Sequence, residues 1–214
     1  MLFKNRADAG KQLALKLAKF ADAINVVVVG IARGGIAVAF EIASTLHLPL
    51  ALIVVRKVSA PENEELALGA ITDSGEGIFN NELISFLSVS DDYIKKEVEK
   101  EKELAASRVK LYTSNNKQPD IRDKTVILVD DGVATGATIR AAIQSLKKGG
   151  AKELIVAIPV ASGDSLQGIS KEVAQVVVLS SPSFFEAVGN FYENFAQVSD
   201  EEILDFMQRL NKKT

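Results

Sequence analysis

The sequence predicts an α/β protein with a central, mainly parallel sheet flanked by helices. Short apolar runs rich in β-branched residues recur along the 214 residues, and segments with apolar residues at three- and four-residue spacing separate several of them. Strands that are buried on both faces produce the first pattern, and amphipathic helices produce the second. Because the two patterns alternate, we expect strand, helix, strand units with right-handed crossovers.

The expected elements follow from these patterns in chain order. Strands are expected at 25–30, 49–55, 125–129, 154–158 and 176–179, where Val, Ile and Leu predominate. Helices with one apolar face are expected at 10–20, 36–46, 137–146 and 165–173. A long exposed helix is expected at about 90–111, because Ser90 can cap a run rich in Glu and Lys. A capping box predicts a last helix, whose cap and apolar stripe comprise Ser199, Glu202, Ile203, Phe206, Met207 and Leu210.

The chain shows no internal repeat and no low-complexity linker. Residues 114–120, SNNKQPD, have the composition of a loop and not of a domain boundary. We therefore expect residues 1–214 to form a single domain, with a C-terminal helical tail at about 184–211.

The composition excludes several classes of protein and site. Hydrophobic residues make up 47% and charged residues 25% of the chain, which suffices for one buried core. The net charge of -3 and the lack of a basic cluster argue against nucleic-acid binding. With no cysteine and one histidine, a bound metal would need oxygen ligands. The charged N-terminus and the lack of an apolar run near ~20 residues favour a cytoplasmic protein that does not enter a membrane.

The stretch VILVDDGVATGAT, residues 126–138, places two carboxylates directly after an apolar strand. In an open parallel sheet, ligands bind beyond the carboxyl ends of the strands, and Asp130 and Asp131 lie at such an end. The small and hydroxylated residues that follow leave backbone amides exposed to bind a phosphate at the start of the next helix. Carboxylates for a diol and amides for a phosphate together indicate a ribose 5-phosphate.

This stretch resembles the phosphoribosyl pyrophosphate (PRPP) signature of type I phosphoribosyltransferases. The resemblance implies the type I fold, with a flexible loop and a small hood. It also implies that Asp130 and Asp131 hold the 2- and 3-hydroxyls of the ribose, directly or through Mg²⁺. The residues implied to wrap the 5-phosphate are Ala134, Thr135, Gly136, Ala137 and Thr138. A plain strand, turn and helix capped by Asp is the structural alternative.

A second motif, VVVVGIARGGIAVAFEIA, supports the first from a distant part of the sequence. It surrounds Arg33 with small residues between a buried strand and a helix. It resembles the pyrophosphate loop of the same family, which commonly contains a non-proline cis peptide bond. The resemblance implies that Arg33 and Gly34 bind the diphosphate, whereas the motif taken alone is also compatible with a generic strand-to-helix turn.

Residues 54–70 predict a strand that ends in Arg56 and Lys57 and opens into a long loop. This segment resembles the mobile catalytic loop of the family, which closes over the site and shields it from water. The resemblance implies that both cations face pyrophosphate oxygens and are catalytic together with Asp130 and Asp131. An ordinary basic strand end is the alternative for each cation.

The predicted function is that of an Mg²⁺-dependent phosphoribosyltransferase of nucleotide and nucleoside metabolism. As a pentosyltransferase, it would transfer the 5-phosphoribosyl group of PRPP to a nitrogenous base or similar acceptor and release pyrophosphate. A non-catalytic PRPP- or nucleotide-sensing regulator of the same fold is the alternative. The expected partners are PRPP and a nucleobase-like small molecule, with no nucleic acid and no membrane, and a homodimer is compatible with the sequence.

The acceptor base is not identified by the sequence. In the salvage enzymes for hypoxanthine and guanine, an Asp that handles a purine proton matches the position of Ala134, and alanine cannot act in that way. The tail at 184–203 resembles that of an uncharacterised branch of predicted phosphoribosyltransferases.

Overall fold

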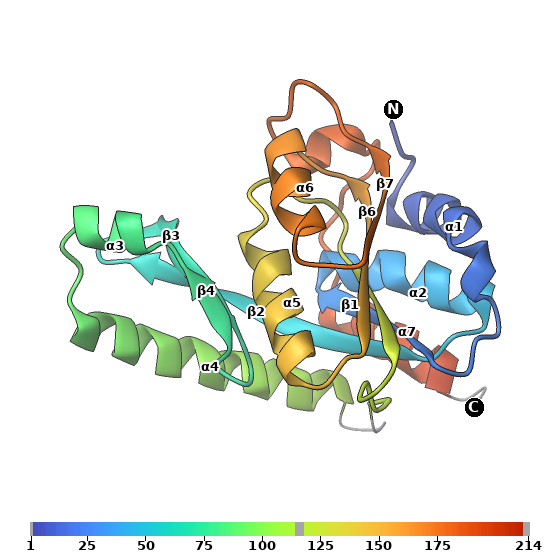
Figure 1. Ribbon diagram of the computed structural model, residues 1–214, viewed down its shortest axis with the longest axis horizontal. Coiled ribbons are helices and arrows are strands. Elements are labelled where there is room, and N and C mark those ends of the chain that lie inside the picture. Colours follow the sequence, from blue (N-terminus) through green and yellow to red (C-terminus); the bar gives the residue numbers. More distant parts are fainter. Residues whose placement is uncertain (1, 114–117, 212–214) are drawn as a thin grey trace.

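The computed structural model describes residues 2–113 and 118–211, apart from the side chains of Glu64, Glu65 and Asn211. Within these residues, seven strands form one sheet in the order β4-β3-β2-β1-β5-β6-β7 (Figure 1). The strands are β1 (Val26–Ala32), β2 (Leu50–Ala60), β3 (Asn63–Thr72), β4 (Gly77–Phe79), β5 (Thr125–Val129), β6 (Glu153–Val160) and β7 (Gln175–Ser180). Strands β2, β1, β5, β6 and β7 are parallel neighbours, whereas β3 and β4 pair antiparallel. The mainly parallel sheet predicted from the sequence is confirmed.

Helices pack on both faces of the sheet. They are α1 (Arg6–Lys16), α2 (Gly34–Leu46), α3 (Asn81–Phe86), α4 (Asp91–Thr113), α5 (Ala137–Lys148), α6 (Gly163–Ser170) and α7 (Asp200–Asn211), with 3-10 turns at Ala18–Phe20 and Val188–Phe191. One core lies between the sheet and α1, α2, α4 and α7, and a second lies between the sheet and α5 and α6. Successive residues of β1 alternate between them, since Val28 joins the first core and Val29 the second.

The capped helices confirm the sequence pattern. Helix α4 begins at Asp91, where the Ser90 hydroxyl accepts a hydrogen bond from the Tyr93 backbone N–H at 3.3 Å. Before α7, the Ser199 N–H donates to the Glu202 carboxylate at 2.8 Å, and the Glu202 N–H donates to the Ser199 hydroxyl at 3.2 Å. The tail between β7 and α7 is less helical than expected, because its described residues form only a single 3-10 turn.

The expectation of a long loop after Arg56 and Lys57, within residues 54–70, is wrong. Strand β2 continues past the two cations to Ala60, and the chain then pairs back antiparallel as β3. The cations interrupt the apolar run, but Val58, Ala60, Leu68 and Ala70 are all buried in the hairpin. The period-two pattern of a strand therefore continues where the sequence was interpreted as a loop.

A small hood forms where the N-terminal segment meets the C-terminal tail. Phe3 pairs with Tyr192 in an isolated parallel bridge, and the two rings lie 5.4 Å apart between centroids. The Phe3 N–H donates to the Phe191 carbonyl and the Glu193 N–H donates to the Phe3 carbonyl, both at 2.8 Å. The N-terminal segment and the tail before α7 are thereby held near the carboxyl end of β6, because Phe3 and Tyr192 share a buried cluster with Val160.

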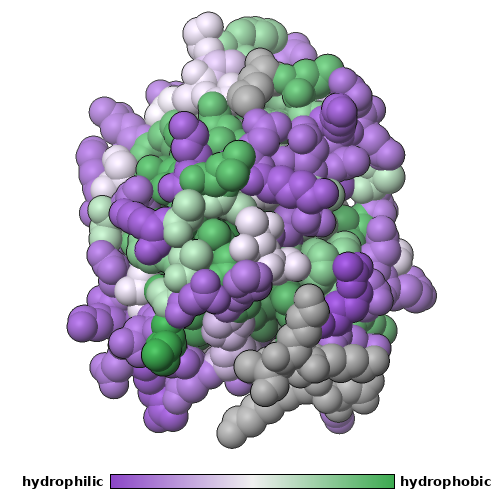
Figure 2. Space-filling view, turned by 90° about the vertical axis from the view of Figure 1, so that its right-hand side faces the viewer, coloured by the Kyte–Doolittle hydropathy of each residue, from purple (hydrophilic) through white to green (hydrophobic). Residues whose placement is uncertain are grey.

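The outer surface is mixed in character. On the side of the molecule at the right of Figure 1, hydrophilic side chains surround patches of hydrophobic ones (Figure 2). None of the described helices is both long and apolar enough to cross a membrane.

Candidate functional site

The carboxylates of Asp130 and Asp131, here called the acidic dyad, follow β5 and lie against the start of α2. A Cβ atom at Gly34 would overlap the Asp131 carboxylate, and one at Gly35 would come within 2.9 Å of an Asp130 carboxylate oxygen. Glycine at both positions therefore allows the dyad to approach the N-terminus of α2. That end of a helix carries partial positive charge, which favours nearby anions. The structure thus brings the predicted Gly34 and the dyad together.

Asp131 has partners that the sequence did not predict. The Arg6 guanidinium at the start of α1 donates from Nε to Asp131 Oδ2 at 2.7 Å and from Nη1 to the Ala196 carbonyl at 2.7 Å. It also stacks over the Phe195 ring at 3.9 Å from the centroid, and its side chain is 11% exposed. The Tyr192 hydroxyl donates to the Asp131 carbonyl at 2.6 Å.

These contacts join residues far apart in the chain, so that no local pattern in the sequence could reveal them. Arg6 lies 125 positions before Asp131, and Tyr192 lies 61 positions after it. Only the packing of α1 and the hood against the end of β5 brings the three residues together. Asp131 is therefore in contact with the first helix and with the tail that precedes α7.

The electrostatics of the dyad follow from burial and like charge. Burial raises the pKa of Asp130 well above its usual range, and the neighbouring Asp131 carboxylate raises it further. Burial also raises the pKa of Asp131, and the Arg6 guanidinium opposes this effect. Burial and the Asp131 charge raise the pKa of Tyr192, so its hydroxyl remains a donor. Within the described chain Asp130 forms no ion pair of its own, and the Arg6 guanidinium that contacts Asp131 also lowers the pKa of Asp130.

The loop from Ala134 to Gly136, here called the amide loop, precedes α5 and exposes backbone donors. Within the part of the chain that the structure describes, the amides of these residues have no hydrogen-bond acceptor. Gly136 adopts the left-handed conformation, with φ of 80°, which glycine alone reaches without cost. Ala137 and Thr138 then form the first turn of α5, whose leading amides are also free of helical partners.

Helix α6 fixes the amide loop from behind. The hydroxyls of Ser162 and Ser165 both donate to the carbonyl of Ala134 at 2.7 Å. Ser162 also caps α6, because its hydroxyl accepts from the Ser165 N–H. Sequence reasoning missed both serines, although the N-cap preference of serine was a local signal for an earlier start of α6. Because the C=O and N–H of a trans peptide unit point in opposite directions, holding the Ala134 carbonyl directs the Thr135 amide away from these two serines.

Arg33 follows a cis peptide bond with Ala32, as the family resemblance implies. Its guanidinium Nη1 lies 4.0 Å from Asp200 Oδ1 at the start of α7. The same carboxylate oxygen accepts a hydrogen bond from the Tyr112 hydroxyl at 2.6 Å. Burial and the hydrogen bond with Asp200 raise the pKa of Tyr112 to about 12, so the hydroxyl stays protonated. Arg33 therefore sits beside Gly34 in sequence, while its side chain is directed to α7.

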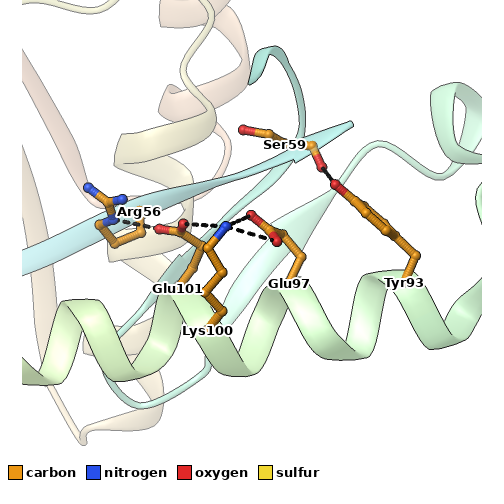
Figure 3. Close-up of polar contacts among 6 residues, drawn as sticks. All are labelled: Arg56, Ser59, Tyr93, Glu97, Lys100 and Glu101. Carbon is orange, nitrogen blue, oxygen red and sulfur yellow. Dashed lines mark hydrogen bonds and ion pairs between the residues drawn. The ribbon is translucent and has the colours of Figure 1, made fainter. Parts of the chain in front are cut away.

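Arg56 and Lys57 lie on opposite faces of β2, because side chains alternate along a strand. Arg56 Nε donates to Glu101 Oε2 of α4 at 2.6 Å (Figure 3). A cavity of about 800 Å³ between β2 and α4 is lined by both residues of this pair and by Lys57. Lys57 also lines a second cavity, of about 720 Å³, together with Thr135, Ala137 and Thr138. The structure thus brings Lys57, and not Arg56, to the amide loop.

Removing the Arg56 side chain is expected to destabilise the fold. Glu101 is 6% exposed, and Arg56→Ala would leave its carboxylate without the 2.6 Å partner. We expect the free energy of unfolding to fall by about 1 to 3 kcal/mol in urea denaturation. The variant Arg56→Ala/Glu101→Gln, which removes the buried charge as well, should recover part of this loss. Unchanged stability of Arg56→Ala would show that the ion pair is dispensable.

Comparisons with known proteins place the chain in a family. Residues 2–195 match the model of the phosphoribosyl transferase domain. "Putative phosphoribosyl transferase Rv0571c" and "Putative phosphoribosyl transferase MT0597", from two strains of Mycobacterium tuberculosis, are each 36% identical over 211 residues. These matches cover 99% of this chain and 47% of each relative, so the chain spans about half the length of the curated relatives it matches.

A solved structure extends the likeness to the whole fold. The crystal structure of TT1426 from Thermus thermophilus has a TM-score of 0.82 and 35% sequence identity, and the match covers 98% of this chain and 99% of that one. The family model and the relatives agree with the acidic dyad and the amide loop in pointing to one family. The chain belongs to the phosphoribosyl transferase domain family.

Proposed function

We propose that the chain transfers the 5-phosphoribosyl group of PRPP to a nitrogenous acceptor and releases pyrophosphate. The observation that carries this proposal is that the acidic dyad, at the carboxyl end of β5, closely precedes a loop whose amides have no hydrogen-bond acceptor among the described residues. Carboxylates accept hydrogen bonds from hydroxyls, and free amides before a helix bind phosphate. A ribose 5-phosphate presents both groups, at opposite ends of one sugar.

In this proposal different site residues bind the ribose, the 5-phosphate and the diphosphate of PRPP. Asp130 and Asp131 hold the ribose hydroxyls, and Arg6 fixes the orientation of the Asp131 carboxylate through its 2.7 Å contact. The 5-phosphate lies against the amide loop and the first turn of α5, where Thr135 and Thr138 add hydroxyl donors. Arg33 and the Gly34 amide bind the diphosphate. Because Arg33 faces Asp200, a shift of its side chain accompanies binding.

The dyad also fits a magnesium ion. Asp131 Oδ2 contacts Arg6 and Asp130 Oδ1 accepts from the Asp131 N–H at 2.9 Å, so one further oxygen on each carboxylate remains for a hard cation. No three acidic or histidine side chains of the described residues converge on one point. Mg²⁺ typically binds one or two carboxylates together with substrate phosphates and water. When bound here, Mg²⁺ would neutralise charge on the diphosphate.

The chain needs no covalent nucleophile for this reaction. Displacement of pyrophosphate from C1 builds positive charge on the sugar and negative charge on the leaving group, so that catalysis depends on positioning and electrostatics. The dyad fixes the ring for attack by an acceptor nitrogen. Lys57, which forms no ion pair within the described residues, donates to the leaving diphosphate. Arg56 joins it only in a conformation that releases it from Glu101.

The dyad is tested by PRPP binding to the variant Asp130→Asn/Asp131→Asn. Asparagine keeps the shape of the side chain and removes the charge. We expect calorimetry to show an affinity roughly 10- to 100-fold lower, because hydrogen bonds to charged groups contribute about 1.5 to 3 kcal/mol. Asp120→Asn is the control, because Asp120 pairs with Arg122 on the surface. If the double variant binds PRPP as tightly as the unaltered protein does, the dyad is not the ribose site.

A further inference from the structure

A cavity of about 450 Å³ lies on the second core side of the sheet, away from the proposed active site. Its floor is apolar and is formed by Val29 of β1 and by Ala51 and Ile53 of β2. Leu146 of α5 and Ile121 complete the apolar wall. The cavity shares no lining residue with the two cavities beside Arg56 and Lys57. The amide loop lies at the N-terminus of α5, whereas this cavity borders the C-terminal half of the same helix. Most of the 12 residues of α5 therefore lie between the amide loop and the cavity.

The cavity lies beside a part of β2 that β3 does not cover. Their pairing ends with Thr72 opposite Val55, and the chain then turns back into β4. The first residues of β2, from Leu50 on, therefore have no strand on this side. Gln118 partly replaces one, because its side-chain carbonyl accepts a hydrogen bond from the Leu52 N–H at 2.8 Å. Leu52 and Gln118 both line the cavity.

The rim of the cavity is rich in hydrogen-bond acceptors and hydroxyls. Ser74 and Ser145 both line it and lie 3.4 Å apart between their hydroxyl oxygens. The Thr72 hydroxyl, which is fully buried, contacts the hydroxyl of Ser74 at 2.8 Å and that of Ser145 at 3.3 Å. These contacts place a chain of three hydroxyls between the β3–β4 turn and α5, next to an apolar floor.

Two carboxylates, those of Asp73 and Glu76, line the cavity, and of the two only Glu76 has an ion pair among the described residues. Glu76 is neutralised by Lys148 of α5 at 2.5 Å. Asp73 also lines the cavity, but it forms no ion pair with any of the residues in 2–113 and 118–211. Burial raises its pKa, and the backbone amides of Asp73 and Ser74 oppose this effect. Asp is common in turns because its side chain accepts hydrogen bonds from nearby backbone amides. This preference does not account for a carboxylate that is partly buried beside an apolar cavity.

We propose that this cavity is a second binding site, for a small flat ring compound that carries a cationic or hydrogen-bond-donating nitrogen. The ring packs on Val29, Ala51 and Ile53, and the nitrogen donates to Asp73, with Ser74 and Ser145 beside it. The volume lies within the range of small-molecule sites, which combine apolar walls with a few placed polar groups. This inference goes beyond the proposed transfer reaction and does not rest on it.

The test uses benzamidine as the cationic probe, with benzamide and benzoate as neutral and anionic probes of the same shape. Binding to the full chain is followed by NMR titration of the backbone amides, without PRPP. We expect saturable benzamidine binding that shifts amides around the cavity, with benzamide at least roughly tenfold weaker and benzoate weaker still, because a charge-assisted hydrogen bond contributes about 1.5 to 3 kcal/mol.

Two matched variants decide whether Asp73 is responsible. Asp73→Asn should remove the preference for benzamidine over benzamide. Asp92→Asn, which removes an exposed charge from the first turn of α4, should retain it. The absence of saturable benzamidine binding overturns the proposal. So does benzamidine binding that Asp73→Asn leaves unchanged, or amide shifts that lie only around the acidic dyad and the amide loop.

Discussion

Lys57→Ala is expected to slow phosphoribosyl transfer roughly thirty- to a thousand-fold while changing PRPP affinity much less. Lys57 lines the cavity that Thr135 and Thr138 also line, and it has no ion-pair partner among the described residues. Its contact with the leaving diphosphate strengthens as negative charge develops, so its loss affects the transition state more than the bound substrate. A lost contact of this kind is typically worth about 2 to 4 kcal/mol.

Arg56→Ala serves as the matched comparison, because it removes the adjacent cation from the opposite face of β2. Its guanidinium is held by Glu101, so we expect a smaller effect on turnover and a larger effect on stability. Both variants are assayed for PRPP affinity by calorimetry and for turnover by pyrophosphate release. If Lys57→Ala turns over like the unaltered protein, the β2–β3 hairpin has no catalytic role. If Arg56→Ala is the slower variant at equal stability, the ion pair with Glu101 opens during catalysis.

Removal of divalent cations is expected to weaken PRPP binding on the order of 100-fold. The diphosphate would otherwise face the dyad, where Asp130 forms no ion pair in the described chain and the Arg6 guanidinium pairs with Asp131. Two like charges about 4 Å apart near a protein surface repel by roughly 4 kcal/mol. A cation between them replaces this repulsion with attraction to both charges. Calorimetry with Mg²⁺ and with excess chelator measures the effect directly. Inorganic phosphate, which needs only the amide loop, is the control ligand and should bind nearly equally in both buffers. Equal PRPP affinity after chelation would contradict a metal role for the dyad.

The sequence predicted those features that depend only on residues close together in the chain. The five parallel strands are apolar runs that report burial on both faces, and all five are confirmed. The residues of the amide loop were predicted from a single continuous stretch, because a phosphate cradle before a helix needs small residues in a row. The cis peptide bond at Arg33 was implied by the resemblance of one short motif.

Features that depend on tertiary packing could not be predicted. Arg6 carries no local signal for its contact with Asp131, because the two residues meet only after α1 packs beside the sheet. The hairpin of β2 and β3 was mistaken for a loop, because Arg56 and Lys57 interrupt the apolar run that defines a strand. Side chains alternate along a strand, so Arg56 and Lys57 point to opposite faces of β2. The sequence did not predict this, because the residues after Lys57 were interpreted as a loop.

The central claim, phosphoribosyl transfer from PRPP, is tested most directly by pyrophosphate release in a screen of nitrogenous acceptors. Purified protein is incubated with PRPP, Mg²⁺ and each acceptor in turn, and Asp130→Asn/Asp131→Asn defines the background. The proposal predicts acceptor-dependent release of pyrophosphate with at least one nucleobase or related nitrogen compound, and its loss in the double variant. PRPP binding that depends on the dyad, without release for any acceptor, would contradict transfer and indicate a sensor that retains the fold.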